Sequence, residues 1–486
     1  MPKRLLARMP LTTRLCRSAL GLALGLALAA TAARAQTPPL EYGFSLQAAA
    51  AAEGRLPFWL HADRRGVFDL AGGNALARLH VRRPFDPDRK LAFAFEADVL
   101  ARASERSTAY VHQLYGSLRY GAFRLTAGRK AETAGLVDPS LSLGSMTLSP
   151  NAAPLPGISL AFDYIPIIVL PGKTELIHAK GFFGHAWLDG DRFVKGAFVH
   201  EKYLYLRGIG PDDFPVHAYA GVSHFVVWGG EHPRLGKLPS DFRAFLDVVL
   251  ARAGEPGDAP KGEVVNALGN TVATYDFGLS VNLPAFRVMA YRQFFIETSP
   301  AARFRNPWDG LWGVSVRFKK AGVLRGLLWE HVNTKRQGSR HDRNEPDGAD
   351  SYYNNFLYKS GWVYHGRALG LPLIFGDGVR RGVINNLLVA HHVGAEGVVA
   401  GRFAFKTLLT YSRNYGARDD CNDDGCSGNP TLLTPRRDQY SFLFEIGGPL
   451  SPRLGFTAAL ALDVGALYPD NAGLMLGLSW TNRTRE

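Results

Sequence analysis

The chain has 486 residues, with 56 Lys and Arg, 43 Asp and Glu and 3 cysteines, a length sufficient for one large domain or several smaller ones. Six of the basic residues and none of the acidic ones lie in the first 35 positions, so the remainder carries 50 basic against 43 acidic residues and a net charge of +7 rather than +13. This modest balance argues against nucleic acid as a partner and is compatible with an acidic glycan or lipopolysaccharide.

The N-terminus predicts a secretory signal peptide over residues 1–35. A basic start is followed by an apolar run over residues 19–33, and Ala33-Arg34-Ala35 is a small-x-small cleavage site that makes Gln36 the mature N-terminus. A membrane anchor helix is the alternative, but the run is short and rich in Ala and Gly. No paired arginines precede it, which favours export by the Sec route over the twin-arginine route.

Beyond the leader, segment after segment alternates with a period of two. In residues 74–82, for example, Ala75, Ala77 and Leu79 share one face of a strand, whereas Arg78 lies on the other. The same alternation recurs in residues 91–102, 123–130, 273–283, 311–319 and 453–464. The pattern predicts strands with one apolar and one polar face, which suits either a soluble sandwich or a transmembrane barrel.

Two features favour the barrel. A sandwich of this length would form several domains, and no Pro/Ser-rich linker separates them. Aromatic residues such as Tyr110, Tyr120 and Tyr440 lie near the ends of apolar faces, as bilayer-facing strands require, and the final alternating strand ends at Trp480. At about 25 residues per strand with its connection, the mature length predicts an all-β, antiparallel transmembrane barrel of about 18 strands.

The predicted domain organisation is a single outer-membrane β-barrel over residues 36–486, in which 36–73 form a short N-terminal segment with the first strand. One short helix is expected over residues 240–250, with Ser240 or Asp241 as its cap. Long loops and an irregular insertion are expected where polar, Gly-rich or Pro-rich stretches interrupt the alternation, over residues 336–350, 413–437 and 133–157.

Cys421 and Cys426 are the two cysteines that remain after cleavage, and they lie in a polar stretch. In an oxidising compartment they are expected to form a disulfide, with two free thiols as the alternative. The aspartates between Asp419 and Asp424 offer oxygen ligands for calcium, but they lack a regular loop spacing, and a solvated acidic loop is the preferred interpretation. No metal site and no cofactor is predicted.

Catalytic motifs are weak. Ser223 and His224 are adjacent, but neighbours on a strand point to opposite faces, so they do not form a dyad. By the same reasoning, the rings of His391 and His392 point to opposite faces, so they are not expected to share a metal. The sequence therefore predicts a protein that is not an enzyme.

Aromatic rings beside amide and carboxylate groups are a different signal, because sugar rings stack on flat apolar faces while their hydroxyl groups bond to polar neighbours. An interfacial aromatic girdle is the alternative for each ring. The candidate polysaccharide-binding residues are Trp228, Trp308, Asp309, Asp350, Tyr352 and Tyr353.

Six stretches stand out by their content of Trp, Tyr, Pro, Gly and Asn: residues 56–60, 142–157, 224–230, 306–312, 350–364 and 370–372. Taken in this order, they resemble the Wzi family of capsule-assembly outer-membrane proteins. The resemblance implies a large barrel of eighteen strands and a non-enzymatic role in holding capsular or other long-chain polysaccharide at the cell surface. It also implies a helical bundle before the barrel, for which residues 36–73 leave little room.

The leading hypothesis is an outer-membrane barrel of a Gram-negative-type bacterium that binds, anchors or organises capsular or other extracellular polysaccharide. Its expected partners are this polysaccharide, outer-membrane lipid and lipopolysaccharide, and the barrel-insertion machinery. The alternatives are a porin-like channel for anionic solutes and an outer-membrane hydrolase, which would need a Ser–His pair on adjacent strands facing the same side.

Overall fold

The computed structural model describes residues 38–483 except 172–174, 210–214, 256, 258–259, 261–262, 265–266, 321, 338–349, 377–381, 418–420, 423–424 and 427–430. The predicted signal peptide, residues 1–35, lies outside the described residues and stays a prediction.

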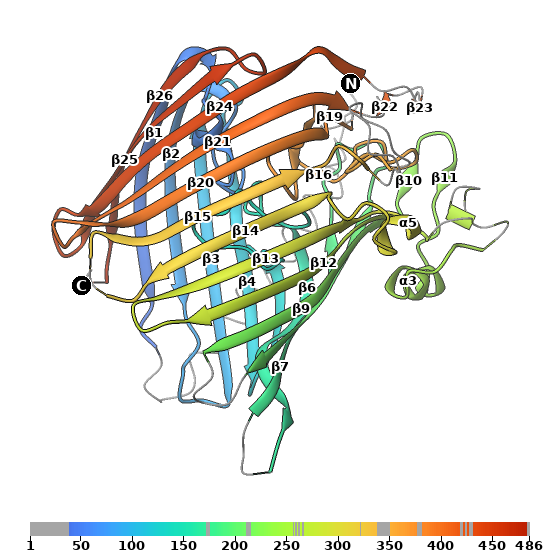
Figure 1. The fold of residues 1–486 in the computed structure, drawn as a ribbon, viewed down its shortest axis with the longest axis horizontal. Coiled ribbons are helices and arrows are strands. Elements are labelled where there is room, and N and C mark those ends of the chain that lie inside the picture. The colour runs from blue at the N-terminus through green and yellow to red at the C-terminus, as the bar shows by residue number, and fades with distance from the viewer. Residues whose placement is uncertain are drawn as a thin grey trace, which may run out of the picture.

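Eighteen strands form one closed antiparallel sheet, because β1 pairs with both β2 and β26 (Figure 1). The predicted all-β barrel of about 18 strands is confirmed. In chain order its strands are β1 (Glu41–Arg55), β2 (Ala71–Arg83), β3 (Leu91–Ala103), β4 (Thr108–Tyr120), β5 (Phe123–Arg129), β6 (Pro156–Val169), β7 (Glu175–Trp187), β8 (Phe198–Ile209), β9 (Val216–Trp228), β12 (Asn270–Asn282), β13 (Phe286–Ile296), β14 (Gly310–Phe318), β15 (Leu324–Asn333), β20 (Leu387–Val399), β21 (Phe403–Ala417), β24 (Thr431–Pro449), β25 (Leu454–Gly465) and β26 (Asn471–Thr481).

The connections between these strands contain only short elements. They are α2 (Phe58–His61), β10 (Glu231–His232), β11 (Gly236–Lys237), α3 (Phe242–Val249), α5 (Ser299–Ala302), β16 (Val363–Tyr364), β17 (Arg367–Ala368), β18 (Phe375–Gly376), β19 (Val383–Asn385), β22 (Cys421–Asn422) and β23 (Gly425–Cys426). Within the described part of the chain, no helix is long and apolar enough to cross a bilayer.

The alternation of the sequence places apolar side chains on the outside of the barrel. On β26, Leu474, Leu476 and Leu478 are between 52 and 64% exposed, whereas Met475 points inward and is buried. A continuous exposed apolar band of this kind marks a surface that contacts something other than water. In a closed barrel that something is the bilayer.

The two ends of the barrel differ. At one end the strands are joined by short turns such as 121–122, 283–285 and 400–402, and the start of β1 pairs with the end of β26 there. At the other end lie the long connections 56–70, 130–155, 229–269 and 334–386. Barrels of the outer membrane place short turns in the periplasm and long loops outside, which orients this chain.

Aromatic pairs mark both edges of the apolar band. At the short-turn end they are Tyr42–Trp480, Phe123–Phe162, Phe286–Phe318 and Phe403–Phe456, with ring centroids 5.6 to 6.4 Å apart. At the long-loop end they are Tyr411–Tyr440 and Phe198–Trp228, at 5.0 and 5.3 Å. Such girdles lie at the two membrane–water interfaces.

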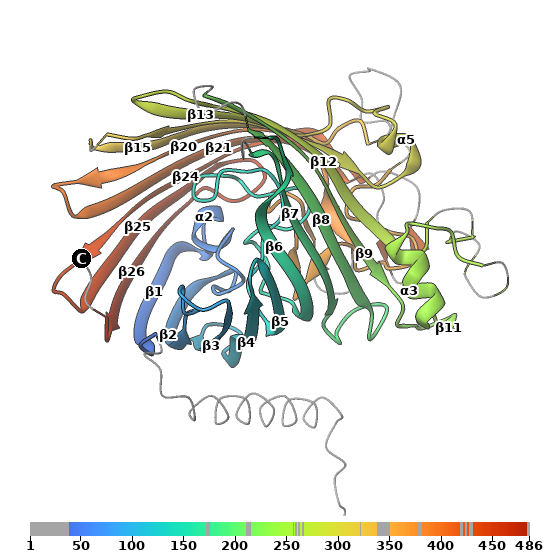
Figure 2. The ribbon, with the colours of Figure 1, turned by 90° about the horizontal axis from the view of Figure 1, so that it is seen from below.

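Residues 56–70, 130–155 and 350–376 fold into the lumen, and together they are called the plug. In Figure 2, α2 of the first segment lies inside the ring of strands. Buried apolar side chains from all three segments form one core with the inner wall. They include Phe58, Leu60, Leu141, Met146, Tyr353, Trp362 and Leu371.

The local expectations have different outcomes. The predicted helix is present as α3, and Asp241 caps it by accepting a hydrogen bond from the backbone N–H of Ala244 at 2.8 Å. The expected loop over residues 413–437 is wrong in extent, because β21 continues to Ala417 and β24 begins at Thr431. Polar residues continue the strands there, since Arg413 pairs with Asp438 across the ladder.

Candidate functional site

The plug is held by side chains of the barrel wall. Glu330 on β15 is fully buried and accepts hydrogen bonds from the backbone N–H of Leu143 at 2.7 Å, Ser142 Oγ at 2.7 Å and Tyr291 Oη at 2.6 Å. The first two donors belong to the plug and the third to β13. A buried carboxylate with three donors is a satisfied group, so this contact fixes the second plug segment in place.

A second wall carboxylate has the same role. Asp276 on β12 accepts from the backbone N–H of Leu136 at 2.9 Å, from Tyr205 Oη at 3.0 Å and from Gln293 Nε2 at 3.0 Å. Gln293 in turn accepts from the backbone N–H of Met146 at 3.0 Å. At Asp276, Gln293 and Glu330, polar side chains of the inner face therefore bond to the backbone of the plug.

This filling of the lumen bears on the channel alternative. Trp362 donates to Thr147 O at 2.7 Å and Tyr353 donates to Met146 O at 2.5 Å, so the third plug segment is tied to the second. The first segment bonds to both, since the backbone N–H of Arg65 donates to Pro150 O at 2.6 Å and Arg367 donates to His61 O at 3.1 Å. Three mutually bonded segments across the lumen disfavour a porin-like channel.

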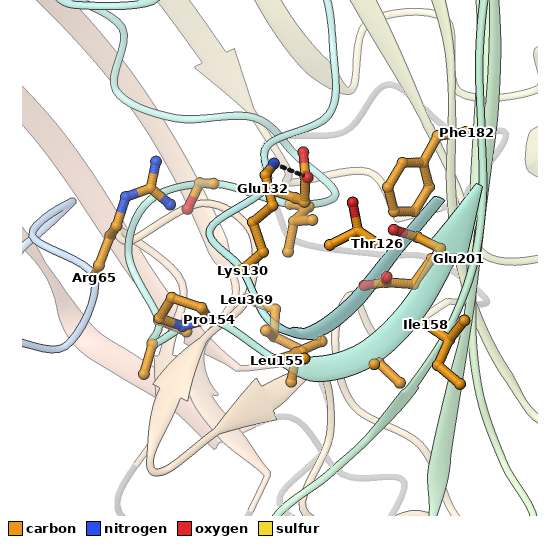
Figure 3. A pocket seen from close by; sticks show the side chains of 18 residues that line it. Arg65, Thr126, Lys130, Glu132, Pro154, Leu155, Ile158, Phe182, Glu201 and Leu369 are labelled. Atoms are coloured by element: carbon orange, nitrogen blue, oxygen red, sulfur yellow. Dashed lines mark hydrogen bonds and ion pairs between the residues drawn. The ribbon is translucent and has the colours of Figure 1, made fainter. Parts of the chain in front are cut away.

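A small cavity of about 40 Å³ lies between the plug and strands β5 to β8. Figure 3 shows Phe182 and Glu201 on the wall side and the ion pair between Lys130 and Glu132 opposite. The volume has room for water molecules but not for a sugar ring.

A larger cavity of about 680 Å³ is bounded by the plug and by strands β20, β21, β24 and β25. Its lining reaches Gly447 and Gly448 near the short-turn end. Its charges are mixed, and Arg64 pairs with Glu445 at 2.7 Å. The charged lining residues are Asp63, Arg64, Arg65, Asp138, Glu396, Lys406 and Glu445. A mixed lining of this kind offers no preference for an anion or a cation.

The cavity at the long-loop end, called the rim cavity, is different. It has a volume of about 850 Å³ and is bounded by all three plug segments and by strands β1 to β5. Its basic lining residues are Arg55, Arg102, Arg106, Arg129 and Arg367. Among its described lining residues, the carboxylates are Asp69 and Glu105. The lining also includes the aromatic rings of Phe58, Phe68, Tyr110, Tyr364, Phe375 and Tyr468.

Backbone carbonyls of the plug hold two of these arginines. Arg367 donates from Nη1 to His61 O at 3.1 Å and from Nη2 to Phe68 O at 2.5 Å. Burial, together with nearby arginines, lowers the pKa of Arg367 to about 10, so it remains charged at neutral pH. Arg102 donates to Val67 O at 3.3 Å. Bonding to neutral carbonyls positions these cations without neutralising them.

Aromatic side chains orient two others. Arg129 donates to Tyr364 Oη at 3.1 Å, and the guanidinium of Arg55 lies 4.5 Å from the ring centroid of Tyr468. A guanidinium has five N–H donors in a planar fork that matches a carboxylate. These contacts use only part of that capacity, so the rim cavity can offer donors to an anionic ligand.

The sequence-predicted residues do not form one site. Tyr352 donates to Asp309 Oδ2 at 2.9 Å, and Asp309 also accepts from the backbone N–H of Gln337 at 2.6 Å. Burial raises the pKa of Asp309 to about 6. Asp350, Tyr352 and Tyr353 are all buried. In this arrangement the four side chains hold loops together rather than face solvent, and direct contact with a glycan stays a prediction.

The two tryptophans lie apart from that cluster. Trp228 is buried on the outer wall, against α3, and Trp308 is 55% exposed in the loop before β14. The backbone on either side of Trp308 is fixed by Arg292, which donates to Pro307 O at 2.9 Å and to Asp309 O. Of the six predicted residues, Trp308 alone presents an exposed side chain.

The arginines of the rim cavity were missed by sequence reasoning. Arg55, Arg102 and Arg129 each stand within two residues of the end of a strand that enters a long-loop-end connection. That position was readable from the alternation. Their convergence was not, because it depends on how the barrel closes and how the plug folds inward.

Two other sequence expectations concern neighbouring residues. Ser223 points into the lumen and bonds to Thr274 Oγ1 at 2.7 Å, whereas His224 is on the outer face of β9, so the two do not form a dyad. His392 contacts Thr410 in the lumen at 2.8 Å, and His391 lies against Trp329.

The structure describes the backbone at the expected disulfide but not the two side chains. Cys421 and Cys426 are direct partners in the β22–β23 ladder. Their side chains lie outside the described part of the chain, as do Asp419 and Asp424, so both the disulfide and the acidic-loop interpretation stay predictions.

Comparison with known families decides the relationship. The model of the capsule assembly protein Wzi family matches residues 72–377, more than half of the chain. The chain belongs to this family. The resemblance predicted from sequence is thereby confirmed, and so is the expectation of a non-enzymatic class. A search of curated proteins gave no match.

A solved structure supports the fold. The protein is similar to Wzi of Escherichia coli, described as an outer-membrane protein involved in group 1 capsule assembly and a carbohydrate-binding β-barrel. The identity is 14%, the TM-score is 0.57, and the match covers 90% of this chain and 83% of that one. It is also similar to OccK5 of Pseudomonas aeruginosa, at 10% identity, a TM-score of 0.45 and coverage of 91% and 97%. The outer-membrane location predicted from sequence is confirmed.

Proposed function

We propose that the protein binds and organises capsular or other extracellular polysaccharide at the cell surface, and that it takes an anionic segment of the polymer into the rim cavity. The observation that carries the proposal is the convergence of five arginines with aromatic rings in one cavity at the long-loop end. Its volume of about 850 Å³ falls within the range of roughly 300–1,000 Å³ that is usual for ligand sites.

The chemistry favours a polymer that carries carboxylate groups. Guanidinium–carboxylate hydrogen bonds are charge-assisted and are frequently bidentate, so they give both strength and orientation. Aromatic faces beside them suit the apolar faces of sugar rings. A mutation that removes one charged hydrogen bond costs about 1.5–3 kcal/mol, equivalent to roughly 10–100-fold in affinity.

Several finer expectations belong to the same proposal. The Wzi barrel of Escherichia coli is described as carbohydrate-binding, and we infer polysaccharide binding for this chain by analogy. We also infer that residues 1–35 are a Sec signal peptide, that residues 36–486 form one domain, and that Cys421 and Cys426 form a disulfide. We further infer that the protein contacts lipopolysaccharide and that the barrel-insertion machinery recognises its final strand.

The first experiment measures surface polysaccharide on cells with and without the gene, separating attached from shed polymer. Loss of the gene is expected to lower the attached fraction and raise the shed fraction. The double variant Arg55→Gln/Arg106→Gln should behave like the deletion. The matched control is Arg305→Gln, an exposed arginine in another long-loop-end connection. Unchanged attachment in the deletion strain would contradict polysaccharide organisation.

The second experiment tests the cavity with purified protein. The probes are the polymer shed by the same cells and the same polymer after chemical reduction of its carboxyl groups. We expect the native polymer to bind in a salt-sensitive manner, and the double variant to bind it about tenfold or more weakly. Equal binding of the native and the reduced polymer would reject the role of the arginines, although not polysaccharide binding itself.

A further inference from the structure

Helix α3 lies outside the barrel, beside the end of β9 (Figure 2), and the ring of Phe245 also contacts Phe183 of β7 and His200 of β8. Its inner side packs Ala244 and Val248 onto Val226 and Trp228. Both partners point outward, because the residues of β9 between them, such as Val227, belong to the core of the lumen. The helix therefore occupies part of the surface that the bilayer surrounds.

The helix also has a second apolar face, whose side chains remain largely exposed in the described part of the chain. Phe242, Leu246 and Leu250 recur at four-residue spacing and are 73, 41 and 54% exposed. Together with the inner side they leave only a narrow polar arc, at Arg243 and Asp247. A helix on an aqueous surface shows one apolar stripe of about 100°. An apolar arc that continues around to the exposed side is typical of helices at a membrane interface.

The height of α3 on the wall agrees with an interfacial position. Phe245 lies 5.9 Å from Trp228, one of the aromatic residues that mark the long-loop edge of the apolar band. The C-terminal turn of α3 lies nearer to the short-turn end of the barrel than Trp228 does. There Lys202 of β8 donates to the backbone carbonyl of Val249. Immediately below, Leu204 and Val222 are 46 and 39% exposed and belong to the lipid-facing band. The exposed face of the helix is thus continuous with the surface that contacts lipid.

We propose that α3 is an interfacial anchor that inserts Phe242, Leu246 and Leu250 among the acyl chains of the outer leaflet, with Arg243 and Asp247 at the headgroup level. The anchor widens the barrel on one side at the external interface. It thereby fixes the height and tilt of the barrel, and with them the position of the rim cavity above the membrane. The proposal rests on α3 and the adjoining wall and is independent of polysaccharide binding.

The test uses the full-length protein in vesicles of bacterial phospholipid, with and without lipopolysaccharide. An environment-sensitive fluorophore is attached at Leu246→Cys, and the matched control is Asp247→Cys, one residue away on the polar arc. Cys421 and Cys426 are replaced by Ser in both variants and in an unlabelled reference. Because neither position belongs to the buried face of α3, the barrel should fold normally, and its resistance to unfolding by detergent at room temperature verifies this.

Quenching by brominated lipid and by aqueous iodide is then compared. At position 246 we expect about twofold or more stronger quenching by brominated lipid than at position 247, and the opposite order for iodide, since an interfacial helix buries its apolar face by roughly 5–10 Å. Equal access of iodide to both positions would overturn the proposal by placing the helix in water. Protection of position 246 from both quenchers would overturn it too, because a second protein copy would then cover the face.

Discussion

The plug interface and the rim cavity both bring charged side chains into the interior of one barrel, but they differ in how these charges are matched. At the plug interface Glu330 has three donors from the same chain, and Asp276 has another three. In the rim cavity the described arginines outnumber the carboxylates, and two of them bond to neutral carbonyls of the plug. A matched charge stabilises the fold, whereas an unmatched one remains available to a ligand.

This difference separates two tasks that polar residues have in a barrel lumen. Below the rim cavity, the plug closes the pore. Wall side chains bond there to the backbone of residues 130–155 and so select one arrangement of this segment. The rim keeps an open cavity of about 850 Å³ between the plug and strands β1 to β5. Variants at each place should therefore have separable effects.

The largest expected effect follows from breaking the plug interface with Glu330→Ala. Three donors, from Ser142, Leu143 and Tyr291, would lose their acceptor in a buried setting. We expect a destabilisation of roughly 3 kcal/mol or more, since each unsatisfied group costs about 1–3 kcal/mol. Loosening of residues 130–155 should also raise ionic conductance in planar bilayers, which the native protein is expected to show only weakly.

Glu330→Gln is the control for this prediction, because an amide oxygen can still accept two of the bonds, and its effect should be smaller. The measurements are the midpoint of thermal unfolding, single-channel current and protease access to residues 130–155. If Glu330→Ala left all three unchanged, the plug would be held by its apolar packing rather than by the wall carboxylates.

An intermediate effect is expected at His61, which belongs to the first plug segment and also lines the rim cavity. The side chain is buried, and burial with nearby Arg367, Arg55 and Arg64 holds its pKa well below 6.5. Below pH 6.5 the unfolded chain binds a proton that the folded state does not. Stability should therefore fall as the pH is lowered from 6.5, by up to about 1.4 kcal/mol per pH unit.

The variant His61→Gln removes this proton uptake. The free energy of unfolding is measured for parent and variant at pH 7.5 and pH 5.0, and the difference between the two pH values should be smaller in the variant. Identical pH dependence would show that the imidazole is already protonated in the folded state, in conflict with its buried position among arginines.

The smallest effect is expected for Trp308→Ala, which tests whether the outer rim adds to the cavity. The side chain is 55% exposed, so stability should change by less than about 0.5 kcal/mol. If the ring stacks on a sugar, polymer affinity should fall about threefold, equivalent to roughly 0.5–1 kcal/mol. Isothermal titration calorimetry with the shed polymer measures this affinity, and Phe304→Ala in the same loop is the control. A loss as large as that of Arg55→Gln/Arg106→Gln would move the main site from the rim cavity to the outer rim.

Sequence alone determined the class of this protein. Alternation with a period of two is a local property of each strand, and an apolar outer face is imposed by the bilayer wherever the strand lies, so β2, β3, β12 and β26 could be recognised without a structure. The start of α3 was also predicted locally, with Ser240 or Asp241 as its cap, and the structure selects Asp241, which accepts from the backbone N–H of Ala244 three residues later.

Only the tertiary structure decided what fills the barrel and where a ligand can enter. Residues 130–155 show no periodicity, because their hydrogen bonds go to wall residues that are far away in sequence, such as Asp276 and Glu330. Tyr352 and Tyr353 resembled surface aromatics by composition, yet they are buried because the third plug segment turns inward. Arg55 and Arg367 are separated by most of the chain and meet only when the barrel closes and the plug folds, since long-range contacts leave no local signal in a sequence.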